Sequence, residues 1–540
     1  MNYRWLLMLI LLPWWLVACQ QQDPYYADDA TAQTPQFGDT LIMGTIGDAS
    51  NLLPMLSTDS SSSEVSSQIY NGLVRYDKDL NFEGDLAQSW EISADGLEIV
   101  FHLRHDVKWH DGAPFTSADV LFTYQLLIDP QTPTAYSERY KQVTQAAAPD
   151  AYTFKVRYAK PLASALISWA MAIHPQHLLA GKAIAESALA RAPIGTGSYC
   201  FVEWLPGEKI VLERNEDYFE GAPYIKRIVY RIIPDLTTMF LELQSGGLDY
   251  MGLTPLQYAR QTTAPAFTRR FNRFRYPAFA YTYLGYNLHR PLFQDKTVRQ
   301  ALSYAINKKE LVDGVLMGLG QPANGPYKPG SWPYNPNVNS YPYNHEKAMQ
   351  MLSAAGWVDT DGDGIRDKDG KPFEFTIVTN QGNDQRIKSA EIIQRRFQQV
   401  GVKVKIRVIE WASLLKEFIH PGNFDATLMG WTVPIDPDGY NVWHSSKIGK
   451  GQLNFIGYKN ARVDELLEQG RRTLDQQQRK IIYDEFQQIL AEDQPYTFLF
   501  VPDSLPVVAK RFRGIKEAPS GIMHNFIRWY VPTAEQKYLR

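Results

Sequence analysis

The sequence predicts an α/β protein with two lobes and a cleft between them. Its 540 residues are enough for two or three domains, each with its own core. Residues 228–251 and residues 373–409 each follow the order strand, helix, strand with short links, so the two strands of each segment should be parallel. Because these segments lie far apart in the chain, they indicate two lobes, and the cleft between lobes favours ligand binding.

The first residues indicate an exported, lipid-anchored protein. Residues 5–18 form an apolar run that is too short to span a membrane and is typical of a signal peptide, which we assign to residues 1–18. Residues 16–19, LVAC, resemble a bacterial lipobox, which implies cleavage before Cys19 and lipid attachment to it. The polar residues 19–38 are then a flexible tether. An ordinary N-terminal membrane helix with a chance cysteine is the alternative.

Composition narrows the class of ligand. The formal net charge is −3, from 55 basic and 58 acidic residues, which gives no electrostatic reason to expect nucleic acid as a partner. The 31 Tyr and 13 Trp suit sugar-like or peptide-like ligands, since both side chains join a flat apolar face to a polar tip. Two cysteines, Cys19 and Cys200, exclude a disulfide framework and a cysteine-based zinc cluster.

The elements follow in order from residue 40, where a strand begins. Leu97, Ile99, Phe101 and Leu103 alternate and predict a half-buried strand. Residues 116–119, TSAD, form a capping box that begins a helix. The first α/β unit comprises strand 228–233, helix 235–244 and strand 248–251.

The second α/β unit lies in the other half of the chain. It comprises strand 373–379, helix 384–400 and strand 402–409, with Gly401 at the position after the helix where glycine is favoured. Residues 460–470 and 474–492 predict amphipathic helices. Residues 496–501 predict a strand that returns to the first lobe.

Several long motifs in fixed order resemble one protein family. They are the A-x-S-W-x-x-S-x-D-G and F-x-L-R-x-x-V-K-W-H-D-G patterns within residues 87–120, IGTGSY at 194–199, RQALSYAINKKEL at 299–311 and YNHEKAMQMLSAAGW at 343–357. The chain resembles the extracytoplasmic solute-binding proteins of dipeptide, oligopeptide and nickel ABC importers, solute-binding family 5. The match runs from about residue 39 to about residue 530.

The resemblance implies a periplasmic-binding-protein type II fold, with two lobes around a cleft and an extra small domain. Lobe I would comprise residues 39–80, 191–275 and 496–540, the extra domain residues 81–190, and lobe II residues 276–495. It also implies a monomer that works with ABC permease and ATPase subunits. The chain has no phosphate-cradling loop of its own to power transport.

The segment 428–446, LMGWTVPIDPDGYNVWHSS, is the candidate ligand site. Two prolines exclude a regular helix, and a loop with aromatic and polar side chains is typical of a cleft lining, although a surface loop over its own aromatics is the alternative. The resemblance places Trp431 at the cleft and implies Trp431, Thr432, Pro434, Asp436 and His444 as ligand-binding residues.

The same comparison weakens a simple peptide-binding interpretation. In the peptide-binding members an Asp three residues after the Trp pairs with the ligand's amino group, and Pro434 occupies that position here. Asp436 is a possible substitute. His444 is a candidate ligand of a chelated metal, as in nickel-type members, although a hydrogen-bonded loop histidine is the more common case.

Three other groups of side chains imitate metal sites. His105-Asp106 and His110-Asp111 flank a tight turn, and His174 and His177 lack a third ligand nearby, so we interpret both sets as structural. Asp359, Asp361, Asp363 and Asp367 imitate a calcium loop, but Gly370 stands where an EF-hand needs a bidentate Glu. We assign no metal and no cofactor, and keep calcium at this loop as a minor alternative.

The sequence therefore predicts a receptor and not an enzyme. No G-x-S-x-G elbow or H-E-x-x-H motif is present. The expected function is capture of a peptide or related small polar solute by lobe closure, on the extracytoplasmic side of a bacterial membrane, with delivery to a permease. The alternative is a surface lipoprotein of the same fold used for adhesion, sensing or chaperone-like binding.

Overall fold

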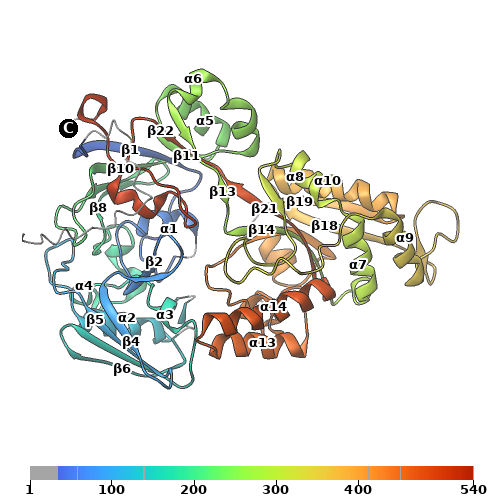
Figure 1. The fold of residues 1–540 in the computed structure, drawn as a ribbon, viewed down its shortest axis with the longest axis horizontal. Helices are drawn as coiled ribbons and strands as arrows, with labels where there is room; N and C mark the ends of the chain where they lie inside the picture. Colours follow the sequence, from blue (N-terminus) through green and yellow to red (C-terminus); the bar gives the residue numbers. More distant parts are fainter. Residues whose placement is uncertain are drawn as a thin grey trace, which may run out of the picture.

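Two large sheets form the cores of two lobes that lie side by side in Figure 1. The computed structural model describes residues 34–538 except residues 58, 135, 138, 139, 411, 412, 450 and 451. The expected signal peptide (residues 1–18) and Cys19 lie outside the described residues. Within them, no helix has the length and apolar character needed to cross a membrane.

The first lobe is built on a sheet of seven strands with a parallel centre. β1 pairs in parallel with both β10 and β11, and α5 connects the last two, so the predicted unit at residues 228–251 is confirmed. Asp235 caps α5, and Gly246 ends it with a φ of 90°, a conformation that favours glycine. The strand order is β12 (Phe271–Arg273), β22 (Pro506–Ala509), β11 (Tyr250–Gly252), β1 (Gly38–Thr45), β10 (Ile225–Ile232), β9 (Lys209–Arg214) and β8 (Tyr199–Leu205), with helices α5 (Leu236–Ser245) and α6 (Pro265–Thr268).

The second lobe is built on another sheet of seven strands. β18 and β19 are parallel with α10 between them, and Gly401 after the helix has a φ of 78°, as the sequence predicts. The strand order is β13 (Tyr276–Pro277), β21 (Tyr496–Ser504), β14 (Ala280–Tyr286), β20 (Ala426–Thr432), β18 (Glu374–Asn380) and β19 (Lys403–Ile409), and β15 (Gly320–Pro322) also pairs with β21. Its helices are α7 (Lys296–Ala305), α8 (Lys308–Gly314), α9 (His345–Ala354), α10 (Asp384–Gln399), α12 (Tyr440–Trp443), α13 (Ala461–Arg472) and α14 (Gln476–Asp493).

The position of β21 corrects one expectation. The strand expected to return to the first lobe at residue 496 instead pairs with β14 inside the second sheet, and β22, which follows Ser504, is the strand that joins the first sheet. The physical reason is the apolar run at the start of β21, where six consecutive buried residues suit a strand covered on both faces. The chain therefore crosses back near residue 505 and not at 496.

A smaller antiparallel sheet lies beside the first lobe. Ile99, Phe101 and Leu103 are buried on one face of β5, as their alternation predicts. The capping box at Thr116 begins α2 as expected. The strand order is β4 (Ala87–Ile92), β5 (Glu98–Leu103), β7 (Thr153–Tyr158) and β6 (Val143–Asp150), with helices α2 (Ser117–Ile128), α3 (Ala165–Ser168) and α4 (Gln176–Leu179). Nearby lie α1 (Ser60–Ser66) and the hairpin of β2 (Val74–Tyr76) and β3 (Phe82–Gly84).

Two strands connect the large lobes. β13 pairs with the end of β21, and both run across the gap between the lobes in Figure 1. Arg275 Nε donates to Asp503 Oδ2 at 2.5 Å and joins the two crossings. A second contact is made at the far end, where Ala163 N donates to Arg471 O at 2.5 Å. The crossings lie at the start of β13 and the end of β21, and a few residues at the ends of such elements can act as a hinge for lobe motion.

Candidate functional site

The candidate segment begins at the end of a buried strand. β20 ends at Thr432, and Trp431 lies opposite Tyr281 of the neighbouring strand β14. The half-buried Trp431 ring stacks on Phe455 at a centroid distance of 6.1 Å, and its Nε1 donates to Tyr496 Oη at 3.4 Å. These contacts hold the indole in place while part of its surface stays open.

Two cavities share Trp431, Thr432 and Tyr281 as walls. The first has a volume of about 70 Å³ and is also lined by Pro326, Tyr327, Val433, Pro434, Asp436, Pro437, Asp438, Gly439, Val442 and Trp443. The second has a volume of about 180 Å³ and is also lined by Ala280, Thr282, Asn383, Gln385, Arg386, Gly430 and Pro502. A concave site with aromatic walls and a few polar groups is typical of small-ligand binding.

The carboxylate of Asp436 is already engaged. Arg479 Nη1 and Nη2 donate to its two oxygens at 3.0 and 3.1 Å, and both side chains are about nine-tenths buried. Asp438 makes a similar pair with Arg471 Nε, at 2.9 Å to each oxygen. Ion pairs thus attach residues 436–438 to α13 and α14. Because both carboxylates are already paired with an arginine, neither is free to bind a ligand's amine.

Pro434 and Thr432 lie beside Trp431 in the wall of the smaller cavity. Both residues are exposed to solvent. Position 434 therefore presents a pyrrolidine ring to the cavity, where the peptide-binding members are expected to present an acid. The Pro437 carbonyl accepts from Tyr327 Oη at 2.7 Å, which fixes the following turn.

His444 lies apart from the other four candidate residues. Its Nδ1 accepts from Ser446 N at 3.0 Å, and its ring stacks on Tyr440 at 4.0 Å. Its Nε2 lies 3.7 Å from Glu468 and 3.9 Å from Asp464. The structure therefore brings Trp431, Thr432, Pro434 and Asp436 around one cavity, whereas His444 caps a short helical turn outside its lining.

A larger cavity lies in the first lobe, along α1 and β2. Its volume is about 640 Å³. Arg75 lines this cavity. Its guanidinium donates to Glu83 at 2.8 Å and to Glu220 at 2.7 and 3.0 Å. Burial raises the pKa of Asp85, next to Arg75, to about 6, while the guanidinium opposes that rise. None of these residues belongs to a recognisable site motif in the sequence.

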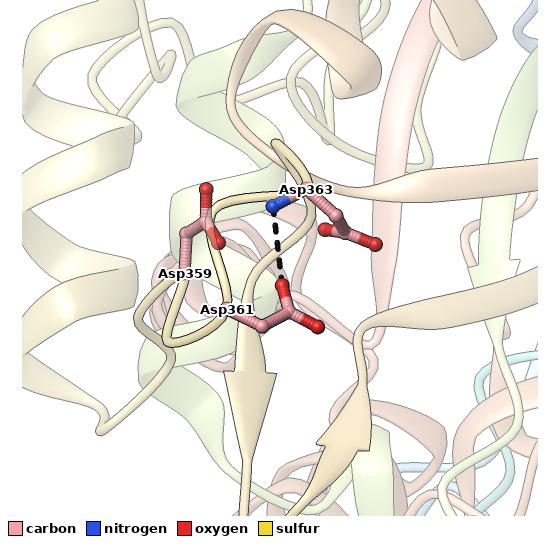
Figure 2. Close-up of side chains that lie close together, drawn as sticks. All are labelled: Asp359, Asp361 and Asp363. Atoms are coloured by element: carbon pink, nitrogen blue, oxygen red, sulfur yellow. Dashed lines mark hydrogen bonds between the residues drawn. The ribbon is translucent and has the colours of Figure 1, made fainter.

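The acidic loop brings together three of its four predicted carboxylates. One oxygen from each of Asp359, Asp361 and Asp363 falls within 4.8 Å of the others, and all three side chains are exposed. Asp359 accepts from Gly362 N and Gly364 N, and Figure 2 shows Asp363 N donating to Asp361. Asp367 accepts from Thr360 N at 3.3 Å instead. These bonds form a tight turn within the loop, and calcium binding here stays the minor alternative.

Three of the histidines expected to be structural, His105, His110 and His177, have protein partners. His110 Nε2 lies 3.0 Å from Gly197 O, His177 Nε2 lies 2.8 Å from Asp111, and His105 stacks on Tyr152 at 3.9 Å. His174 is fully buried, and burial lowers its pKa to about 4.

Comparison with known proteins places this geometry in a family. Residues 81–452 match the bacterial extracellular solute-binding proteins, family 5. The oligopeptide-binding protein AppA of Bacillus subtilis is 35% identical over 539 residues, which covers 97% of each chain. This chain belongs to solute-binding family 5. Heme-binding protein A of Haemophilus influenzae is 30% identical and covers 94% of this chain and 95% of its own.

Solved structures of the family share the fold. AppA from Bacillus subtilis in complex with a nonapeptide superposes with a TM-score of 0.80 at 34% identity, covering 92% of this chain and 100% of that one. NikZ from Campylobacter jejuni in complex with Ni(L-His) gives 0.81 at 29% identity, covering 91% and 99%. The predicted type II periplasmic-binding-protein fold is confirmed. As a member of this family the chain is an extracytoplasmic substrate-binding receptor and not an enzyme.

Proposed function

We propose that this chain is the lipid-anchored receptor of an ABC importer. In this proposal it captures a peptide or a related small polar solute as a monomer, closes its two lobes on it, and delivers it to the permease that the ATPase drives. The observation that carries the proposal is the pair of cavities around Trp431, in the segment that the sequence predicts to line the cleft. The likeness to a protein solved with a bound nonapeptide supports a peptide as the ligand.

The mechanism needs no bond making. Ligand contacts to both lobes favour the closed state, and the permease recognises that state. The two crossing strands β13 and β21 suit such a motion, because few backbone angles need to change there. The first lobe has a cavity of its own, and its volume of about 640 Å³ is in the usual range for ligand sites.

A thermal-shift screen of the soluble form, starting at Gln20, tests ligand capture. Peptide, sugar and metal-chelate libraries are the probes, because a ligand at 100 times its Kd should stabilise the protein by about 2.7 kcal/mol. A peptide pool that raises Tm supports the proposal. If no library moves Tm, the proposed capture of a peptide or related small polar solute is refuted, and the alternative of an adhesive or sensing lipoprotein is favoured.

The lipid anchor has its own test. Cells expressing the full chain and the Cys19→Ala variant are fed a labelled fatty acid. The proposal expects label on the full chain alone, with the variant unlabelled. Equal label on both chains contradicts lipid attachment at Cys19.

A further inference from the structure

The end of α13 in the second lobe touches the small antiparallel sheet, at the end of the gap that is far from β13 and β21 (Figure 1). Ala163 follows β7 of the small sheet, and its N donates to Arg471 O at 2.5 Å. Arg471 lies in the last turn of α13, where carbonyl groups have no partner within the helix. A backbone group from outside the second lobe therefore satisfies this helix end.

Leu474, in the turn between α13 and α14, adds an apolar contact to the same place. A Cβ at Gly96 would lie 2.7 Å from Leu474 Cδ1 and 3.5 Å from Pro161 Cβ. Gly96 lies in the turn between β4 and β5 and has a φ of 68°, a conformation that favours glycine. The lack of a side chain there also leaves the space into which Leu474 reaches, so Leu474 lies against the β4–β5 turn, near Pro161.

This contact is small and partly polar. Leu474 stays 46% exposed within it. A cavity of about 200 Å³ remains between the two sides, and its lining includes residues 160–162 on one side and residues 468, 471 and 472 on the other. Small, polar interfaces between the domains of one chain resemble transient protein–protein interfaces, so these two sides can separate and meet again.

Arg471 also joins this contact to the candidate ligand segment. Its Nε donates to the two carboxylate oxygens of Asp438 at 2.9 Å each, and its guanidinium carbon lies 3.8 Å from the centroid of the Tyr440 ring. Asp438 lines the smaller of the two Trp431 cavities. The main chain of Arg471 thus contacts the small sheet, while its side chain holds part of the cavity wall.

We propose that this contact is a clasp that stabilises the closed state of the receptor. The clasp consists of Gly96, Pro161 and Ala163 on the side of the small sheet and of Arg471 and Leu474 in the second lobe. The inference rests on the proposed receptor function, and it gives the small sheet a role in capture although none of its described residues lines a Trp431 cavity. A bond that forms only in the closed state raises the apparent affinity for ligand, because closure and ligand binding are linked equilibria.

Two variants break the clasp from its two sides. Leu474→Ser removes the apolar contact at a half-exposed position. Ala163→Pro removes the N–H donor. Proline suits this position, because Ala165 N donates to Leu162 O at 2.9 Å and Ser164 has a φ of −83° and a ψ of 6°, which makes Ala163 the second residue of a type I turn. Ile481→Ser on α14 is the control, since it removes an apolar side chain that is 70% exposed from the same lobe.

A distance across the clasp tests the inference. Spin labels at Lys155→Cys on β7 and Val408→Cys on β19, both exposed, are placed in a Cys200→Ser background. Pulsed electron paramagnetic resonance then gives the distance distribution of the parent, the two clasp variants and the control, first without ligand and then at the concentration of a short-peptide pool that closes half of the parent molecules. We expect longer distances in both clasp variants and calorimetric binding of the pool that is about threefold to tenfold weaker, with the control like the parent.

The outcomes separate the clasp from the receptor function. Clasp variants whose distance distributions match the parent in both conditions overturn the inference, while binding of the pool leaves the receptor function intact. A pool that binds none of the proteins refutes peptide capture, and the distributions without ligand then decide the clasp by themselves. Circular dichroism checks folding, and if one clasp variant does not fold, the other decides.

Discussion

Replacing Asp436 by Asn should destabilise the protein and leave ligand binding nearly unchanged. The carboxylate holds Arg479 at 3.0 and 3.1 Å, and the exposed fractions of the two side chains are 10% and 8%. Removing one partner of a buried pair leaves the other charge uncompensated, which costs about 3–5 kcal/mol. Because Asn keeps one acceptor oxygen, we expect a loss near 3 kcal/mol in the free energy of unfolding.

The assay compares urea unfolding with peptide titration on the same preparations. Asp438→Asn is the matched control, since its pair with Arg471 is more exposed, at 20% and 29%, and should cost only about 1 kcal/mol. The double variant Asp436→Leu with Arg479→Met should lose less than Asp436→Asn alone, because it leaves no unpaired charge. If Asp436→Asn keeps the wild-type stability and binds ligand at least about tenfold more weakly, Asp436 is a ligand anchor and our interpretation of the ion pair is wrong.

Three further predictions concern other parts of the chain. Trp431→Ala should weaken ligand binding at least about tenfold by calorimetry if the open face of the ring stacks on ligand, and an unchanged Kd would make Trp431 a core residue only. Burial lowers the pKa of His174 to about 4 from its ordinary 6.5, so the unfolded chain takes up the proton first. The contribution of this group to the free energy of unfolding is complete above pH 6.5 and should fall by about 3 kcal/mol as the pH drops to 4. Parallel denaturation curves of His174→Phe should lack this loss. Equal slopes of stability against pH in the two proteins would contradict the prediction. Calcium should leave the Tm of EDTA-treated protein unchanged, because the carboxylates of the loop at 359–363 already accept backbone N–H groups, and a rise of several degrees would show a calcium site.

The sequence was sufficient for the elements whose patterns are local. Alternation predicted β5, and the end of α10 before Gly401 followed from the glycine, which favours positive φ. The parallel pairing of β18 with β19 followed from the strand–helix–strand order alone. The order of elements did not predict which strands pair outside such strand–helix–strand units. The apolar run of β21 fits either sheet, and only the register with β14 assigns it to the second lobe.

The candidate site was predictable in part for the same reason. Trp431, Thr432, Pro434 and Asp436 are neighbours in sequence, so one segment brings them to one cavity. Arg386 lies near Trp431 because α10 packs on the sheet that contains β20. The sequence around Arg386 does not indicate this proximity. The roles of the two acids depend likewise on Arg471 and Arg479, which lie on helices α13 and α14, far along the chain.

Lobe closure on ligand is the central claim, and a distance between the lobes tests it most directly. Spin labels are placed at Leu241→Cys on α5 and Val408→Cys on β19, both exposed, in a Cys200→Ser background. Pulsed electron paramagnetic resonance then gives the distribution of distances between the two labels, with and without a pool of short peptides. We expect ligand to shorten and narrow the distribution, and Trp431→Ala to require more ligand for the same change. A distribution that is identical with and without saturating ligand would contradict capture by closure.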